Sequence, residues 1–189
     1  QLIPGITVIG VRTLLDAVAY LHGELLEVPQ PQPLVNSAQI VPDLSDVRGQ
    51  SNARHALEIA AAGGHHLAFL GSPGVGKTML AQRLPGLLPQ LTDEQAVEVT
   101  AIYSAAGLLA LGQGLIRTPP FQGPHHTTTK AALIGGGSNT VRVGMVTLAN
   151  HGVLCLDEAA EFERSVLDAL RQPMESGLVA IARSGFSTL

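Results

Sequence analysis

The residues best suited to chemistry lie in a glycine-rich stretch, GSPGVGKT at residues 71–78, which matches the phosphate-binding pattern G-x-x-x-x-G-K-[ST]. Glycines at this spacing let the backbone curl, so that its N–H groups point at phosphate oxygens. We expect Lys77 to reach the β- and γ-phosphates of a nucleotide and the Thr78 hydroxyl to bind Mg²⁺. A plain glycine-rich turn is the alternative, but a short apolar segment precedes the loop and a helical pattern begins inside it, as nucleotide binding requires. The predicted contact residues are Gly71, Ser72, Pro73, Gly74, Val75, Gly76, Lys77 and Thr78.

A second candidate group is a pair of carboxylates after the apolar run VLCL, at Asp157 and Glu158. Ligands bind at the carboxyl ends of parallel strands, which is where this pair would lie. We expect Asp157 to hold Mg²⁺, directly or through water, and Glu158 to polarise an attacking water. A solvated acidic turn is the alternative, yet a second carboxylate free to act as a base favours hydrolysis over binding alone.

Bulk composition limits the class of protein. Of the 189 residues, 46% are hydrophobic, but no apolar run approaches the roughly 18 to 20 residues that cross a bilayer. The net charge of −4 excludes a global basic field for nucleic acid but leaves room for a local basic path. The sequence therefore predicts a soluble, cytoplasmic protein without a membrane partner.

The apolar pattern alternates between helical and strand-like segments, which predicts an α/β fold with a parallel sheet covered on both faces. Helices are expected near residues 13–22, 51–64, 76–86, 92–106 and 161–172. Strands are expected near residues 6–11, 65–70, 152–157 and 178–182. Prolines at 29, 31, 33 and 42 predict an extended linker over 29–42, with one domain before it and another after it.

With both motifs placed, the chain resembles AAA+ ATPases, and more closely the magnesium-chelatase-like ComM/YifB family. The resemblance covers about three quarters of the chain and is carried by residues 43–50, 56–92, 119–137 and 144–183. The segment PHHTTTKAALIGGG is its most specific part. Two departures are RTPPFQG, where a run richer in arginine is expected, and AAEFE after the acidic pair.

The resemblance implies a P-loop NTPase of the AAA+ type, a three-layer α/β/α fold with a central parallel sheet, over residues 43–189. It implies a homo-hexameric ring with ATP and Mg²⁺ at subunit interfaces and an adenine pocket that includes Val47 and Gly49. Residues 1–28 are similar to the tail of an N-terminal domain of the ribosomal S5/Lon-protease type. Sensor residues, the arginine finger and the C-terminal lid would lie beyond Leu189, so these residues alone should turn ATP over poorly.

The stretch LIRTPPFQGPHHTTTKAALIGGGSN, residues 115–139, separates the two motifs and is open to three interpretations. It can be a mobile loop that contacts nucleic acid or a protein, it can be structural, with its prolines stiffening a turn, or it can hold a metal on His125 and His126. Adjacent histidines point apart in an extended chain and no third ligand lies nearby, which disfavours the metal. The candidate DNA contacts are Arg117, Phe121 as a stacking residue, His125, His126, Lys130 and Arg142.

These observations lead to three functional hypotheses. The first is an ATP-hydrolysing ring motor of the ComM/YifB type that remodels DNA, by branch migration or helicase action in natural transformation. The second is a magnesium-chelatase-like motor whose substrate is another protein. The third is a nucleotide-dependent regulatory module that binds ATP but barely hydrolyses it.

Overall fold

The computed structural model describes residues 9–11, 13–24, 41–110, 112–136, 142–183 and 186–188. The chain divides into two compact units, one made of Gln1–Ser37 with Ala110–Leu115 and the other of Ala38–Leu109 with Ile116–Leu189. The predicted linker, 29–42, falls mainly on residues outside the described part, so it stays a prediction. In the described part of the chain, no helix is long and apolar enough to cross a membrane.

The first unit contains helix α1, Leu14–Leu21, which confirms the helix predicted near residues 13–22. The helix begins with a capping box, in which Thr13 Oγ1 accepts a hydrogen bond from Asp16 N (3.1 Å) and Asp16 Oδ2 accepts one from Thr13 N (3.0 Å). Its apolar side chains are exposed, and α1 has no buried residue. The strand predicted at 6–11 lies mostly outside the described residues, and 9–11 form no regular element.

A small hydrophobic core forms around the start of the second unit. It is built by the 3-10 turn η1 (Leu44–Asp46) and the helices α2 (Ser51–Gly63), α3 (Lys77–Ala81) and α4 (Leu84–Leu87). Helix α2 ends as predicted, because Gly64 adopts a left-handed conformation (φ 62°) that side chains disfavour. The helix expected over 76–86 is two short helices, and Pro85 lies at the beginning of α4, where its missing N–H is tolerated. The buried residues of this core are Leu44, Val47, Leu57 and Leu80.

The buried strand predicted at residues 65–70 is wrong for this structure. These residues form no regular element, Leu67 is 39% exposed and Leu70 is 97% exposed. Only Phe69 of the segment packs against the core of Leu44, Val47, Leu57 and Leu80. An apolar run becomes a strand only when a neighbouring chain supplies its hydrogen bonds, and no described segment pairs with this one.

Helix α5, Asp93–Ala105, is the longest element that follows, and it begins where the sequence predicts. Thr92 and Gln95 form the expected capping box, with hydrogen bonds of 3.3 Å to the Thr92 hydroxyl and 3.0 Å to the Gln95 side chain. The buried face of α5 includes Ala96, Val99 and Thr100. This helix packs against α7 (Met145–Leu148).

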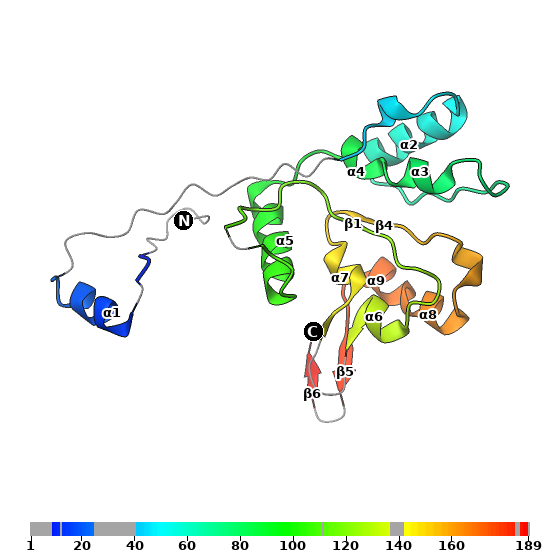
Figure 1. Cartoon of the computed structure of the whole chain (residues 1–189). Helices are drawn as coiled ribbons and strands as arrows, with labels where there is room; N and C mark the ends of the chain where they lie inside the picture. Colours follow the sequence, from blue (N-terminus) through cyan, green and yellow to red (C-terminus); the bar gives the residue numbers. More distant parts are fainter. Residues whose placement is uncertain are drawn as a thin grey trace. The chain divides into compact units, whose positions relative to one another are not determined.

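The structure contains one parallel strand pair among its described residues, and it joins two segments that are distant in sequence. Strand β1 (Phe121–Gln122) pairs with β4 (Val153–Leu154) in the register Phe121↔Val153 and Gln122↔Leu154. Figure 1 shows β1 and β4 running side by side. The fold is therefore mixed α/β with a parallel pair, smaller than the predicted central sheet.

Two antiparallel pairs complete the described strands. They are β2 (Gly135–Gly136) with β3 (Arg142–Val143), and β5 (Ile181–Arg183) with β6 (Phe186–Thr188). The segment 178–182, predicted as a strand of a parallel sheet, thus contributes to an antiparallel hairpin. Whether a strand pairs in parallel or antiparallel fashion depends on its partner segment, and the residues of 178–182 alone do not reveal that partner.

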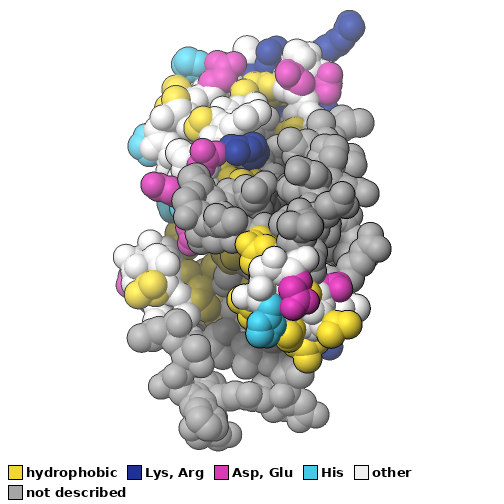
Figure 2. Space-filling view, turned by 90° about the vertical axis from the view of Figure 1, so that its left-hand side faces the viewer, with side chains coloured by type: hydrophobic (Ala, Val, Ile, Leu, Met, Phe, Trp, Pro, Cys, Tyr) yellow, Lys and Arg dark blue, Asp and Glu magenta, His cyan; other side chains and the backbone are white. Residues whose placement is uncertain are grey.

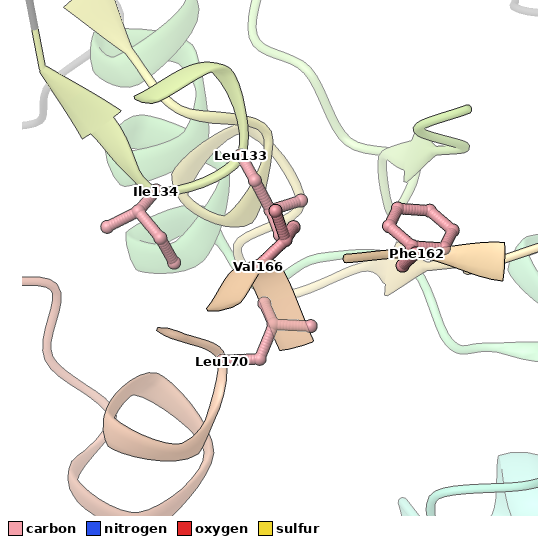
Figure 3. Packing of buried hydrophobic residues seen from close by; sticks show 5 residues of the cluster. All are labelled: Leu133, Ile134, Phe162, Val166 and Leu170. Carbon is pink, nitrogen blue, oxygen red and sulfur yellow. The ribbon is translucent and has the colours of Figure 1, made fainter. Parts of the chain in front are cut away.

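A second hydrophobic core packs against the β1–β4 pair through Leu154 of β4. It gathers side chains of helix α6 (Lys130–Ile134), α7 and α8 (Arg164–Ala169). The 3-10 turn η2 (Ala159–Glu161) precedes Phe162, and helix α9 (Arg171–Ser176) follows Leu170. The helix predicted at 161–172 is broken because the chain is extended at Phe162 and Glu163, which turns the Phe162 ring into the core. Figure 3 shows the five buried residues of this cluster, Leu133, Ile134, Phe162, Val166 and Leu170.

Candidate nucleotide-binding site

The glycine-rich loop at 71–78 curls through two left-handed residues, Gly74 (φ 79°) and Gly76 (φ 90°), and leads directly into α3. Other residue types disfavour these angles, so the two glycines permit the tight path. Gly71, the first glycine of the motif, is not among the glycines with a positive φ. Helix α3 spans five residues, Lys77–Ala81. The helix thus follows the loop as the motif requires, but it is shorter than expected, and the predicted strand before the loop is not formed.

Lys77 lies across the inside of this loop. Its Nζ donates hydrogen bonds to the carbonyl oxygens of Gly71 (2.9 Å) and Ser72 (3.0 Å). An ammonium group has three donors and forms stronger hydrogen bonds with charged acceptors than with neutral carbonyls. Phosphate oxygens would therefore be preferred partners for Lys77 at the mouth of the loop.

The acidic strand end meets the loop directly. Thr78 Oγ1 donates a hydrogen bond of 2.7 Å to Asp157 Oδ2, although the two residues are 79 positions apart in the sequence. Asp157 Oδ1 also accepts a hydrogen bond from the backbone N–H of Glu158 (3.0 Å). A hydroxyl and a carboxylate side by side are the oxygen ligands that Mg²⁺ uses when substrate phosphates complete its coordination. The donor set of Thr78 and Asp157 therefore fits Mg²⁺.

No larger metal centre accompanies this pair: among the described residues, no group of three or more His, Cys, Asp or Glu side chains could hold a metal ion. Mg²⁺ bound with a nucleotide needs only one or two protein ligands. The residues His125 and His126 come together without such a group, with ring centroids 4.0 Å apart. The expectation that the two rings point apart is wrong, because the chain turns at this point and Thr128 N bonds to the His125 carbonyl (2.8 Å).

Glu158 has an unusual backbone conformation at the end of this strand. Its φ of 52° and ψ of 48° are left-handed, which non-glycine residues rarely adopt outside functional or tightly turned sites. Its side chain is 68% exposed and its Oε2 lies 3.7 Å from Nδ1 of His126. The carboxylate is thus accessible to water and faces the segment that follows β1, a contact that the sequence did not predict.

The segment that precedes α2 borders the loop from another direction. Gln50 Nε2 donates a hydrogen bond of 2.6 Å to the carbonyl of Val75. Gly49 has a φ of 72° and is open to solvent, whereas Val47 is only 2% exposed and packs in the core with Leu57. Gln50, next to Gly49, thus contacts the loop, whereas the Val47 side chain packs in the core; the adenine pocket at Val47 and Gly49 stays a prediction.

The proposed DNA contacts are distributed unevenly. Arg117 pairs with Asp93 at 2.7 Å, which neutralises part of its charge, and Phe121 is half-buried in β1. His125, Lys130 and Arg142 are exposed. On the face shown in Figure 2, acidic and basic side chains of the described residues are interspersed. Exposed cations are therefore present in this segment at Lys130 and just after it at Arg142.

The prolines of the stretch are structural: Pro119, Pro120 and Pro124 are buried. Pro120 accepts a hydrogen bond through its carbonyl from Val153 N (2.8 Å), and Cys155 N donates to the Gln122 carbonyl (2.8 Å). Half-burial raises the pKa of the Cys155 thiol, and the nearby Asp157 charge adds to the shift. The stretch predicted as a long irregular connection thus contains the strand that aligns the acidic pair.

Two side-chain networks on α5 support β1 and β4. Tyr103 donates its hydroxyl to the Leu148 carbonyl (3.2 Å) and accepts a hydrogen bond from Gln122 Nε2 (3.0 Å). Burial of Tyr103 raises the pKa of its hydroxyl above its ordinary value. The tyrosine therefore ties α5 to the strand that precedes His125 and His126.

The second network joins α5 to the beginning of β4. Glu98 accepts a hydrogen bond from Asn150 Nδ2 (2.9 Å) and pairs with Nε2 of His151 at 2.8 Å. The hydrogen bond with His151 holds the pKa of Glu98 below its ordinary value. Sequence reasoning gave His151 no role, and no local pattern signals a contact across 53 positions.

The comparisons with known proteins agree with this geometry. The family model of magnesium chelatase, subunit ChlI, matches residues 43–188. An uncharacterized protein of Mycobacterium tuberculosis is 52% identical over 97% of this chain, which spans 36% of that relative. The competence protein ComM of Haemophilus influenzae is 47% identical over 92% of the chain and 35% of its own length. The uncharacterized protein YifB of Escherichia coli is 48% identical, over 88% of the chain and 32% of its own length. The chain thus spans about a third of the length of these curated relatives.

Proposed function

Since this chain belongs to the magnesium chelatase ChlI family, which suggests an AAA+-type ATPase, we propose that it binds ATP with Mg²⁺ and hydrolyses it. The proposal rests on one observation above all, the hydrogen bond between Thr78 and Asp157. A turn that was merely rich in glycine would not need an aspartate from a distant strand at this position. The proposed contacts with the nucleotide are those of the loop 71–78, with Val47 and Gly49 near the base.

The proposed chemistry divides between three side chains. Lys77 would hold the β- and γ-phosphate oxygens, and Thr78 and Asp157 would bind Mg²⁺. The bound ion supplies positive charge that neutralises the phosphate oxygens. Glu158 would take a proton from the water whose oxygen attacks the γ-phosphorus as ADP leaves. Its exposure and its position next to Asp157 support this assignment.

For the substrate, we propose DNA, handled by a homo-hexameric ring with ATP at the subunit interfaces. The similarity to a competence protein and the exposed Lys130, Arg142 and His125 support this choice. A protein substrate, as in magnesium-chelatase-like motors, is the second candidate and is supported by the family match. A regulatory module that only binds nucleotide is disfavoured by the intact Lys77, Asp157 and Glu158.

The test is ATP turnover by the full-length protein, with and without single-stranded and branched DNA. Glu158→Gln serves as the blank, because it keeps the shape of the side chain and removes the base. We expect this variant to bind ATP normally and to lose at least about a hundredfold in turnover, in line with the contribution of a general base. Unchanged hydrolysis would refute the assignment of Glu158. Turnover that DNA leaves unaffected would favour the protein substrate.

A further inference from the structure

His126, which sequence reasoning placed among the candidate DNA contacts, faces Glu158 in the structure. Nδ1 of His126 lies 3.7 Å from Glu158 Oε2, and the histidine side chain is 29% exposed against 68% for the glutamate. The ring of His126 is held on its other side by the ring of His125, 4.0 Å away. His125 is fixed in turn by Thr127, whose hydroxyl lies 3.0 Å from His125 Nδ1. The imidazole that faces the carboxylate is therefore more buried and better supported than the carboxylate itself.

The backbone explains why these two residues meet. Gln122 pairs with Leu154 in the parallel register, and Cys155 N continues the ladder to the Gln122 carbonyl (2.8 Å). His126 and Glu158 each lie four residues beyond the end of their strand, so the pairing of β1 with β4 brings the two following segments close together. The left-handed backbone at Glu158 then turns this residue out of line with the strand. The contact is thus a product of strand pairing.

The neighbouring carboxylate is engaged elsewhere. Asp157 accepts a hydrogen bond from Thr78, which belongs to the glycine-rich loop. It accepts a second one from the backbone N–H of the next residue, Glu158. The end of β4 therefore presents two carboxylates to two different segments, Asp157 to the loop and Glu158 to the residues after β1. A side chain that sets the orientation of Glu158 need not touch nucleotide or Mg²⁺.

We propose that His126 is a positioning residue for Glu158, which holds the carboxylate in the orientation from which it takes the proton of the attacking water. The inference rests on the proposed function, because it assigns His126 to the base of that reaction. It also assigns distinct roles to the two histidines, with His126 acting on Glu158 and His125 supporting the ring of His126.

The size of the effect follows from the geometry. The pair is 3.7 Å apart and half open to solvent, and exposed pairs of this kind shift a conformational equilibrium by about two- to fivefold. We expect His126→Ala to lower kcat for ATP by about that factor in the full-length protein. KM and the Kd for ATP should stay within about twofold, because the ion pair and the ring contact of His126 are with Glu158 and His125, not with the loop 71–78.

Two further variants make the test specific. His126→Asn retains a nitrogen donor near the position of Nδ1 and should restore most of kcat. The matched control is His55→Ala, which removes another loose pair, His55 with Glu58 at 3.8 Å on α2, away from the site. It should leave kcat unchanged. In a Glu158→Gln background, His126→Ala should have no additional effect, since the group it positions is gone.

The outcomes separate this inference from the proposed function. Turnover that persists in Glu158→Gln overturns the proposed base and the positioning role together. Loss of turnover in Glu158→Gln with kcat unchanged or raised in His126→Ala overturns the positioning role alone. A loss that His126→Asn does not restore, or one that appears in KM, also overturns it, since either result indicates a structural or binding contribution.

Discussion

Gly152 offers the sharpest test of how the fold supports the site. It lies just before β4, and a side-chain carbon built on it would collide with the carbonyl oxygen and the ring of Pro120. The same carbonyl accepts the hydrogen bond from Val153 N (2.8 Å) that begins the β1–β4 ladder. The close approach of the two backbones therefore requires glycine at this position, and we predict that Gly152→Ala forces the strands apart.

The expected cost combines two effects. Overpacking typically destabilises by about 1–3 kcal/mol, and here the clash involves backbone that cannot rotate away. Loss of the Val153–Pro120 hydrogen bond adds about 0.5–1.5 kcal/mol. Together these give about 1.5–4.5 kcal/mol, which lowers the melting temperature of a protein of this size by roughly 3–18 °C. The Kd for ATP should also rise, because Asp157 follows β4 and depends on its position.

The assay is thermal unfolding followed by calorimetry, together with titration of ATP at a temperature where both proteins are folded. Gly10→Ala is the matched control, because an added carbon at Gly10 has no neighbour within 4 Å. It should change the melting temperature by less than about 1 °C. A Gly152→Ala variant as stable as the parent would refute the argument that close backbone contact holds β1 against β4.

Two further predictions concern the loop and the support from α5. Lys77→Ala should weaken ATP binding about ten- to a hundredfold, the effect of removing one charge-assisted contact. Lys130→Ala, which removes the other lysine, should leave ATP affinity unchanged and reduce the salt dependence of DNA binding. Equal ATP affinity in both variants, measured by titration calorimetry, would contradict the role of Lys77. The folded-state pKa of Glu98 is lowered from 4.5, chiefly by its hydrogen bond to His151, so its contribution to stability is present above pH 4.5 and is lost as the pH falls through the folded pKa. Denaturant unfolding at pH 7 and below pH 4.5 should therefore show a smaller acid loss for Glu98→Gln than for the parent, and an identical loss would argue against the contact.

The sequence predicted well those features that depend on a few neighbouring residues. The capping box of Thr92 and Gln95 and the glycine at 64 set the ends of α5 and α2, because each acts on the helix in which it lies. The glycine-rich loop followed by α3 is of the same kind. Asp157 could be assigned to the loop because both motifs have recognisable residue types, although nothing local says that they touch.

The predictions that were wrong concern features that depend on partners far away in the chain. The apolar run at 65–70 has strand composition but no described neighbour to complete its hydrogen bonds, and Leu70 remains exposed. Strand β1 has only two residues and so carries no period that could reveal it. The interruption of the predicted helix 161–172 at Phe162 could not be predicted from the sequence. An apolar residue at this position fits a helix face and a buried extended segment equally well.

The β1–β4 pair is as important for the proposed hydrolysis as the glycine-rich loop, because it positions Asp157 and Glu158. If the proposed function holds, the loop binds phosphate with its own backbone, and hydrolysis also requires Asp157 and Glu158 to lie at defined positions. In the proposed reaction, the positions of Asp157 and Glu158 would depend on the register of Phe121 with Val153 and Gln122 with Leu154, and the segment after β1 leads to His126. A change in the residues after β1, by DNA or by a protein, would reach Glu158 through its contact with His126 without passing through the nucleotide. Substrate sensing and proton abstraction would then share one short segment of chain, and variants there should alter kcat more than ATP affinity.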